Sequence, residues 1–406
     1  MPSPTRSITT RDVRRHVDEH VFAPKGAQRV GIELEWITRA PSRDLLPSPS
    51  ELRMLLGPTL PGSSRLTFEP GGQLELSGPA HATAAAATAA MAADVAAART
   101  ALAARGVELV GIGLDPTGLR NRVVDEPRYE AMESYFDARW PMGRTMMRNT
   151  AAVQVNVDLG GFGTVDLRWQ RAHDLAPVLA AAFANSPFDA SGAPTGWRST
   201  RLAVWRGLDA RRTRPAARPG TSAASAWTDY ALEAPVMLVR SDEHHCAVPA
   251  RPLPFARWIH EGHELGWPTL DDFAYHLTTL FPPVRPRGWL ELRTVDALPD
   301  EWWPVAVAVS AALLDDPEAA DTAAREAPAL RHRVADAARL ACSDPVIGSV
   351  VDRCFVAALP ALTRAGVHAD TIAAAEDYYE RYVARRRCPA DDLFPFPDPA
   401  RLPAAT

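Results

Sequence analysis

The stretch RVGIELEWIT, residues 29–38, alternates apolar and polar side chains as a β-strand with one buried face does. Its apolar members would point into the core: Val30, Ile32, Leu34 and Trp36. Glu33 and Glu35 would then share the opposite face, about 7 Å apart. Two carboxylates this close repel each other, so a protein usually separates them or pairs them with arginine. The stretch therefore predicts both a strand and a charged site on one of its faces.

Three further segments show the same alternation beside a polar face: QLELS at 73–77, VQVNVD at 153–158 and LELR at 290–293. In that order, their polar faces would carry Gln73, Glu75 and Ser77; Gln154, Asn156 and Asp158; and Glu291 and Arg293. Glu69 begins a Pro-Gly-Gly turn that would join two short strands within 65–79 into a hairpin. An ordinary half-exposed sheet would explain any one of these strands. Four such strands together predict a common acidic surface.

A surface that gathers several carboxylates needs cations to neutralise it. Hard carboxylate and amide oxygens select Mg²⁺ or Mn²⁺ rather than zinc. Carboxylate-bound Mg²⁺ can in turn hold a nucleoside triphosphate in a protein without a P-loop, and Arg293 could neutralise a phosphoryl group during its transfer. Lys25 is the only lysine in the chain, and it lies in neither a P-loop nor a Schiff-base context.

The rest of the chain interleaves strands with long helices. Further strand segments are expected at 106–113, 146–160 and 288–299, with polar connections at 41–50 and 211–226. A first helix is expected near the N-terminus, before a turn at 24–26. Further helices are expected at 80–104, 128–136, 167–185, 271–281 and 301–387. This order predicts an α+β fold with an antiparallel sheet rather than a Rossmann fold. We expect one catalytic domain over 1–406, with a helical C-terminal part at about 300–390.

The composition is that of an ordinary globular protein, with 47% hydrophobic and 23% charged residues. A net charge of −5 and a pI near 6.1 argue against nucleic acid or an anionic membrane as the partner. The four cysteines show no paired spacing, which favours free thiols and a cytoplasmic location. We expect neither a signal peptide nor a membrane span. The oligomeric state stays open.

Six segments together resemble the glutamate–cysteine ligase family over about residues 28–305. They are GIELEW, FEPGGQLELSG, RYEAMESYFD, MMRNTAAVQVNVD, RLAVWRGLDARRT and HLTTLFPPVRPRGWLELRTVDALP. The resemblance is strongest to the actinobacterial branch that makes γ-glutamylcysteine for ergothioneine biosynthesis. It implies a saddle-like antiparallel sheet related to glutamine synthetase, packed by helices, whose concave polar face is the active site of a carboxylate–amine ligase.

The resemblance also implies roles for individual residues. The metal ligands would be Glu33, Glu35, Glu69, Glu75 and Glu291, with Gln154 standing where relatives in other branches carry a histidine. Glu35 and Arg293 would take part in catalysis, because Arg293 matches the family arginine that faces the transferred phosphoryl group.

The candidate residues for substrate binding are arginines chosen from their positions in the same motifs, together with polar and aromatic residues that could line the pocket. They are the arginines Arg148, Arg206 and Arg212 for the substrate carboxylates, and Asn156, Trp205 and Tyr230 for the amino-acid pocket. Each has a simpler explanation. The arginines could form structural ion pairs, Asn156 could be a strand-edge polar residue, and the two aromatic residues could belong to the core.

The implied reaction is the ATP-dependent ligation of L-glutamate to L-cysteine. The γ-carboxylate attacks the γ-phosphorus of ATP, and the cysteine amine then displaces phosphate from γ-glutamyl phosphate. Mg²⁺, or Mn²⁺ in its place, would be the cofactor. Three alternatives remain: another amine acceptor on the same fold, a metal-dependent phosphohydrolase, and a nucleotide-binding module with a degenerate site.

Overall fold

The computed structural model describes residues 7–24, 29–161, 163–240, 245–264 and 266–394. Its centre is a seven-stranded sheet in the order β2-β3-β1-β5-β9-β8, with β4 paired to β1. The strands are β1 (Val30–Arg39), β2 (Arg65–Phe68), β3 (Leu74–Ser77), β4 (Glu108–Val110), β5 (Ala152–Val157), β8 (Val284–Pro286) and β9 (Leu290–Asp296). Every pairing is antiparallel, which confirms the predicted α+β class.

The register of the sheet brings the predicted polar faces together. Neighbouring strands place the following residues opposite each other: Glu35 and Glu75, Glu33 and Gln154, Asn156 and Glu291, and Arg285 and Glu291. Because side chains alternate between the two faces, all of these residues lie on one face of the sheet. The opposite face carries the apolar residues of the same strands.

Three helices cover the apolar face: α3 (Ala84–Ala103), α6 (Val165–Ala182) and α12 (Trp303–Asp315). They contact β1, β9 and β5, respectively. Trp36, Leu74 and Val155 of the sheet are almost fully buried in this core. The alternation in the strands thus separates an apolar face, which packs in the hydrophobic core, from a polar face.

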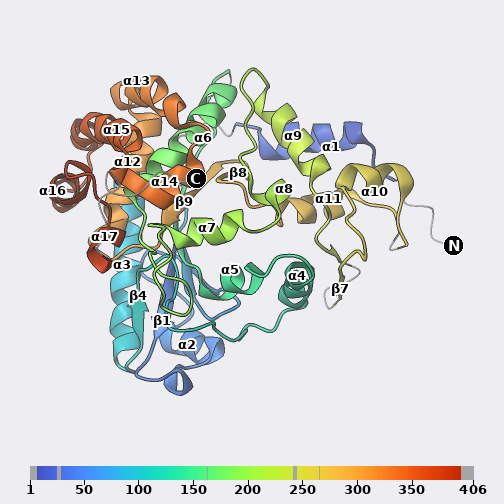
Figure 1. The fold of residues 1–406 in the computed structure, drawn as a ribbon, viewed down its shortest axis with the longest axis horizontal. Helices are drawn as coiled ribbons and strands as arrows, with labels where there is room; N and C mark the ends of the chain where they lie inside the picture. Colours follow the sequence, from blue (N-terminus) through green and yellow to red (C-terminus); the bar gives the residue numbers. More distant parts are fainter. Residues whose placement is uncertain (1–6, 25–28, 162, 241–244, 265, 395–406) are drawn as a thin grey trace.

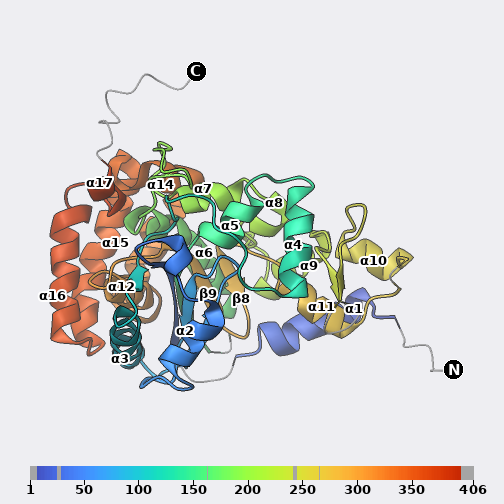
Figure 2. The same ribbon diagram turned by 90° about the horizontal axis from the view of Figure 1, so that it is seen from below.

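Most of the other helices form two groups at opposite ends of the molecule (Figures 1 and 2). One group contains α13 (Pro317–Glu326), α14 (Val334–Leu340), α15 (Pro345–Arg364), α16 (Ala369–Tyr378) and α17 (Ala390–Leu393). The other contains α1 (Thr10–His16), which continues as a π-helical turn at Val17–Val21, with α9 (Ala223–Glu233), α10 (Phe255–Glu261) and α11 (Leu270–Leu277). By length and composition α15 could cross a membrane, but half of its apolar window is buried where it packs against α12 and α13.

Shorter elements border the polar face or connect the groups. They are α2 (Pro49–Leu56), α4 (Pro127–Asp137), α5 (Gly143–Asn149), α7 (Thr200–Arg206), α8 (Ala210–Thr213) and the small strands β6 (Val239–Arg240) and β7 (Cys246–Ala247). Single 3₁₀ turns lie at Arg43–Leu45, Ala327–Leu330 and Ala341–Ser343, and a second π-helical turn at Tyr379–Val383.

Several local predictions were wrong. The connections expected at 41–50 and 211–226 contain helical residues of α2, α8 and α9, and the strand expected at 106–113 is only three residues long. Helix α5 and strand β8 were not predicted, because each is too short to show a periodic pattern. The turn expected at 24–26 lies partly outside the described residues.

A buried carboxylate fixes the end of β9 beside the polar face. Asp296 accepts hydrogen bonds from Ser186 Oγ at 2.7 Å, Ser199 Oγ at 2.9 Å, Arg201 Nε at 2.7 Å and the backbone N–H of Asn185 at 2.8 Å. Because its lone pairs are satisfied, the buried charge is tolerated. The contacts hold the start of α7 against β9, and so bring the last turn of α7 to the edge of the polar face.

Candidate active site

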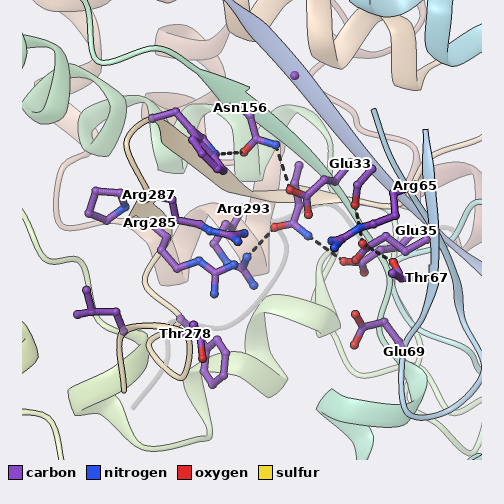
Figure 3. Close-up of a pocket in the computed structure, with 18 of the residues that line it drawn as sticks. Glu33, Glu35, Arg65, Thr67, Glu69, Asn156, Thr278, Arg285, Arg287 and Arg293 are labelled. Atoms are coloured by element: carbon purple, nitrogen blue, oxygen red, sulfur yellow. Dashed lines mark hydrogen bonds between the residues drawn. The ribbon is translucent and has the colours of Figure 1, made fainter. Parts of the chain in front are cut away.

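The polar face of the sheet is the floor of a cleft of about 840 Å³. Residues of β1, β2, β3, β5, β8 and β9 line the floor, and residues of α1, α4, α5 and α11 form the walls. Figure 3 shows the acidic side chains Glu33, Glu35 and Glu69 on one side of the cleft and Arg285, Arg287 and Arg293 on the other.

Three carboxylates converge at the acidic side. Oxygens of Glu35, Glu69 and Glu75 all lie within 4.8 Å of one another. Glu35 accepts hydrogen bonds from the backbone N–H of Ala152 and from Gln154 Nε2, both at 2.9 Å. Thr67 and Ser77 each donate to Glu75 Oε1 at 2.7 Å. These neutral donors orient the carboxylates without neutralising their charge.

The Pro-Gly-Gly turn places Glu69 in this group. The backbone N–H of Glu69 donates to Gln73 O at 2.9 Å, and that of Gly72 donates to Glu69 O at 2.8 Å. Gly72 has φ +83°, a conformation that favours glycine. A Cβ atom on Gly71 would lie 2.0 Å from Arg148 O. Both glycines are therefore needed for the turn to close against α5 and direct Glu69 into the cleft.

Glu291 lies at the centre of a cluster of arginines. It accepts hydrogen bonds from Arg285 at 2.6 and 3.1 Å, from Arg293 at 2.8 Å and from Arg287 at 3.3 Å. Burial alone would raise its pKa, but Arg285 and Arg293 hold the pKa of Glu291 far below the usual range. Arg293 also donates to Gln154 Oε1 at 2.6 Å, which joins the arginine cluster to the carboxylates.

The other acidic residues have the opposite electrostatic environment. Burial, followed by repulsion from Glu291 and Glu75, raises the pKa of Glu33 from 4.5 to about 7. Burial and Glu75 raise the pKa of Glu35 to about 8. Burial and Glu35 raise the pKa of Glu69 well above its ordinary value. Within the described ranges, no arginine or histidine forms an ion pair with any of these three residues.

The donor set fits a hard divalent cation. Glu35, Glu69 and Glu75 offer only oxygen ligands, close enough to share one ion, and the raised pKa values of Glu35 and Glu69 mark an uncompensated negative potential. Mg²⁺ or Mn²⁺ would relieve the repulsion, whereas zinc prefers nitrogen and sulfur ligands.

The structure brings most of the expected site residues together. The cleft is lined by Glu33, Glu35, Glu69, Glu75, Gln154, Asn156, Trp205 and Arg293. Glu291 lies beneath its arginines with no exposed surface, and both its oxygens are already bonded. Gln154 is buried. Its amide donates a hydrogen bond to Glu35 and accepts one from Arg293. Metal binding by these two residues stays a prediction.

Four residues expected to bind substrate lie elsewhere. Arg148 is buried and forms an ion pair with Glu133 at 2.6 Å. Arg212 is fully buried and donates to Thr279 O at 3.0 Å and to Pro235 O. These are the structural roles considered as alternatives, so substrate binding by the two arginines is a prediction that this geometry does not support.

Tyr230 and Arg206 also lie outside the cleft. Tyr230 is a core residue with no exposed surface, and its ring stacks on Trp227 with 5.3 Å between centroids. Arg206 lines a separate cavity of about 170 Å³, which shares Trp205 and Arg293 with the main cleft. A role in substrate binding stays a prediction for both residues.

Sequence reasoning missed five arginines that line the cleft: Arg29, Arg65, Arg128, Arg285 and Arg287. Arg65 belongs to β2, and the register places it opposite Ser77 on the polar face. Arg285 is the middle residue of β8, and Arg287 lies in the turn between β8 and β9. The alternation of RLTFE at 65–69 could have identified Arg65, but β8 was too short to reveal Arg285.

Comparison with known proteins identifies the family of this chain. The model of the family described as glutamate–cysteine ligase family 2 matches residues 29–400. Glutamate–cysteine ligase EgtA of Mycolicibacterium smegmatis is 41% identical over 402 residues, which cover 96% of this chain and 92% of that protein. The protein of the same name from Mycobacterium tuberculosis is 40% identical over 377 residues, which cover 90% of this chain and 85% of that protein.

A likeness among solved structures concerns the fold alone. A bifunctional glutathione synthetase from Pasteurella multocida matches with a TM-score of 0.51 and 12% sequence identity. The match covers 90% of this chain and 48% of that chain, so this chain spans about half of the larger protein.

The raised pKa values predict how the stability of the metal-free protein depends on pH. A carboxyl group with a higher pKa in the folded state than in the unfolded chain destabilises the fold as it ionises. For Glu33 and Glu35 this loss begins near pH 4.5 and is complete above about pH 8. In EDTA, the melting temperature should therefore fall between pH 5 and 8.5, and Glu35→Gln should reduce the fall. Added Mg²⁺ should stabilise the wild type more at pH 8.5 than at pH 6. Parallel profiles for the wild type and the variant would contradict this assignment.

Proposed function

Because this chain belongs to glutamate–cysteine ligase family 2, we propose that it joins the γ-carboxylate of L-glutamate to the amine of L-cysteine at the expense of ATP. The products are γ-glutamylcysteine, ADP and phosphate. The observation that carries this proposal is the cluster of Glu35, Glu69 and Glu75 facing Arg293 across one cleft. Such a site can bring together two anionic reactants, ATP and glutamate, that would otherwise repel each other.

The carboxylate cluster is the proposed metal site. Glu35, Glu69 and Glu75 would hold Mg²⁺ directly. Glu33 would contribute from the same face of β1, two residues before Glu35. When bound, Mg²⁺ lessens the repulsion between the phosphates of ATP and the attacking carboxylate. Gln154 and Glu291 are further ligand candidates from the family resemblance. In this structure, Gln154 orients Glu35, and Glu291 holds the arginines in place.

In the proposed first step, the glutamate γ-carboxylate forms a bond to the γ-phosphorus of ATP, and the bond to the bridging oxygen of ADP breaks. Arg293 would stabilise the charge on the transferred phosphoryl group. Its position supports this role, because Glu291 and Gln154 fix its guanidinium at the edge of the carboxylate cluster. The ion pairs with Glu291 keep Arg285 and Arg293 on one side of the cleft despite their mutual repulsion.

In the second step, the cysteine amine attacks the acyl carbon of γ-glutamyl phosphate. The C–N bond forms, the C–O bond to phosphate breaks, and the amine proton is lost to phosphate or solvent. No enzyme nucleophile is required, so the chain mainly supplies positioning and electrostatic stabilisation. Asn156 and Trp205 line the cleft and are the remaining candidates from the sequence for contacting the amino acids.

The setting of the reaction is part of the proposal. The substrates are small molecules, and we place the reaction in a reducing cytoplasm because all four cysteines are free thiols. The resemblance to the actinobacterial branch supports ergothioneine biosynthesis as the pathway that consumes the product.

Phosphate release tests the reaction. Purified protein should release phosphate from Mg·ATP rapidly only when glutamate and cysteine are both present, and mass spectrometry should identify γ-glutamylcysteine. Equal rates with another amine would overturn the choice of cysteine but keep the ligase chemistry. Release without glutamate would favour a phosphohydrolase, and no release under any combination would contradict the proposed function.

Removing one charge from the carboxylate cluster tests the metal assignment. Glu35→Gln preserves the size of the side chain but removes a ligand charge, so kcat should fall by about 10²- to 10³-fold. Half-maximal activity should also require more Mg²⁺. Glu108→Gln is a matched control, because Glu108 is exposed on β4 of the same sheet. Wild-type turnover and Mg²⁺ dependence in Glu35→Gln would exclude Glu35 as a ligand.

A further inference from the structure

Two hydrogen bonds connect an indole ring to a carboxylate of the acidic cluster. Trp289 donates through Nε1 to Asn156 Oδ1 at 3.0 Å, and Asn156 donates through Nδ2 to Glu33 Oε1 at 3.1 Å. The three residues come from the turn between β8 and β9, from β5 and from β1, respectively. All three line the cleft, and the bonds appear as dashed lines beside Asn156 and Glu33 in Figure 3.

The chemistry of the partners gives this chain of bonds a fixed direction. An indole N–H can only donate, and an ionised carboxylate can only accept. An asparagine amide between them must therefore turn its oxygen to Trp289 and its NH₂ group to Glu33. Without the indole donor, the contact with Glu33 alone would set the orientation of the amide, and Asn156 Oδ1 would lose its partner. Trp289 thus reinforces the amide orientation that donates to Glu33 and restricts the movement of the amide.

Trp289 is itself held firmly. The backbone N–H of Gly288 donates to Val21 O at 3.0 Å, which ties the turn between β8 and β9 to the π-helical end of the N-terminal helix. Gly288 adopts φ +80°, which permits this turn. The Arg287 guanidinium lies over the indole ring at 5.3 Å and also bonds Glu291 at 3.3 Å. The indole is therefore fixed by its backbone and covered on one side.

We propose that Trp289 is a positioning residue for the metal site: its N–H orients the Asn156 amide, which holds the Glu33 carboxylate in the conformation that binds the cation. This inference rests on the proposed function, in which Glu33 contributes to Mg²⁺ binding. Residues that orient metal ligands through hydrogen bonds commonly change metal affinity or activity 10- to 100-fold when they are mutated. No other hydrogen bond to Glu33 from a side chain is present in the part of the chain described by the structure.

Trp289→Phe separates this role from simple packing. Phenylalanine keeps an aromatic ring beneath Arg287 but lacks the N–H donor. Mn²⁺ affinity of the ATP-free protein, measured from the EPR signal of free Mn²⁺, should fall about 10-fold or more. The Mg²⁺ concentration for half-maximal activity should rise in parallel, while the melting temperature in EDTA stays close to that of the wild type. Trp267→Phe is a matched control, because Trp267 is 54% exposed and does not line the cleft.

A double-mutant cycle with Asn156→Ala tests whether Trp289 acts through Asn156. The proposal predicts that Asn156→Ala also weakens Mn²⁺ binding and that adding Trp289→Phe to it causes little further loss. Additive losses, or wild-type Mn²⁺ affinity in Trp289→Phe, would overturn the inference and leave the ligase proposal intact. Absence of Mn²⁺ binding by the wild type would overturn the metal assignment as well. Trp289→Leu, which also lacks the N–H donor, replaces Trp289→Phe in this cycle if the phenylalanine variant does not fold.

Discussion

The mutual repulsion of buried carboxylates on one face of a sheet governs the rest of this structure. The register forces Glu35 opposite Glu75 and sets Glu33 beside Glu35 on the same strand. The same register buries Leu34 and Leu74 on the other face, where the core requires them. A slip of one residue would exchange the two faces, so the strands cannot relieve the repulsion by moving. The chain has to compensate for the charge in another way.

The chain compensates for the carboxylate charges differently at the two sides of the cleft. Arginines surround Glu291 and leave it charged and fully bonded. Glu35, Glu69 and Glu75 receive only neutral donors or none among the described residues, and burial raises the pKa values of Glu35 and Glu69. This asymmetry creates a negative site beside a positive one. A divalent cation suits the first, and phosphate or carboxylate groups suit the second.

The sequence predicted the acidic face well because strand alternation is a local pattern. Glu33, Glu35, Glu75 and Arg293 could be assigned to one surface before any pairing was known, and the Pro-Gly-Gly turn added Glu69. The arginines were harder to assign, because their partners are distant in the chain. Arg148 is paired with Glu133, and Arg212 is bonded to Pro235 and Thr279. A motif position cannot distinguish such structural arginines from Arg285, which reaches the cleft from a three-residue strand.

The most direct test of this account is to locate the cation. Crystals grown with MnCl₂ and a non-hydrolysable ATP analogue would show Mn²⁺ through its anomalous scattering. The account predicts a peak at a metal–oxygen distance of about 2.1 Å from carboxylate oxygens of Glu35, Glu69 and Glu75. In an enzyme shown to be active with Mn²⁺, a nucleotide bound with no metal at these three carboxylates would contradict it.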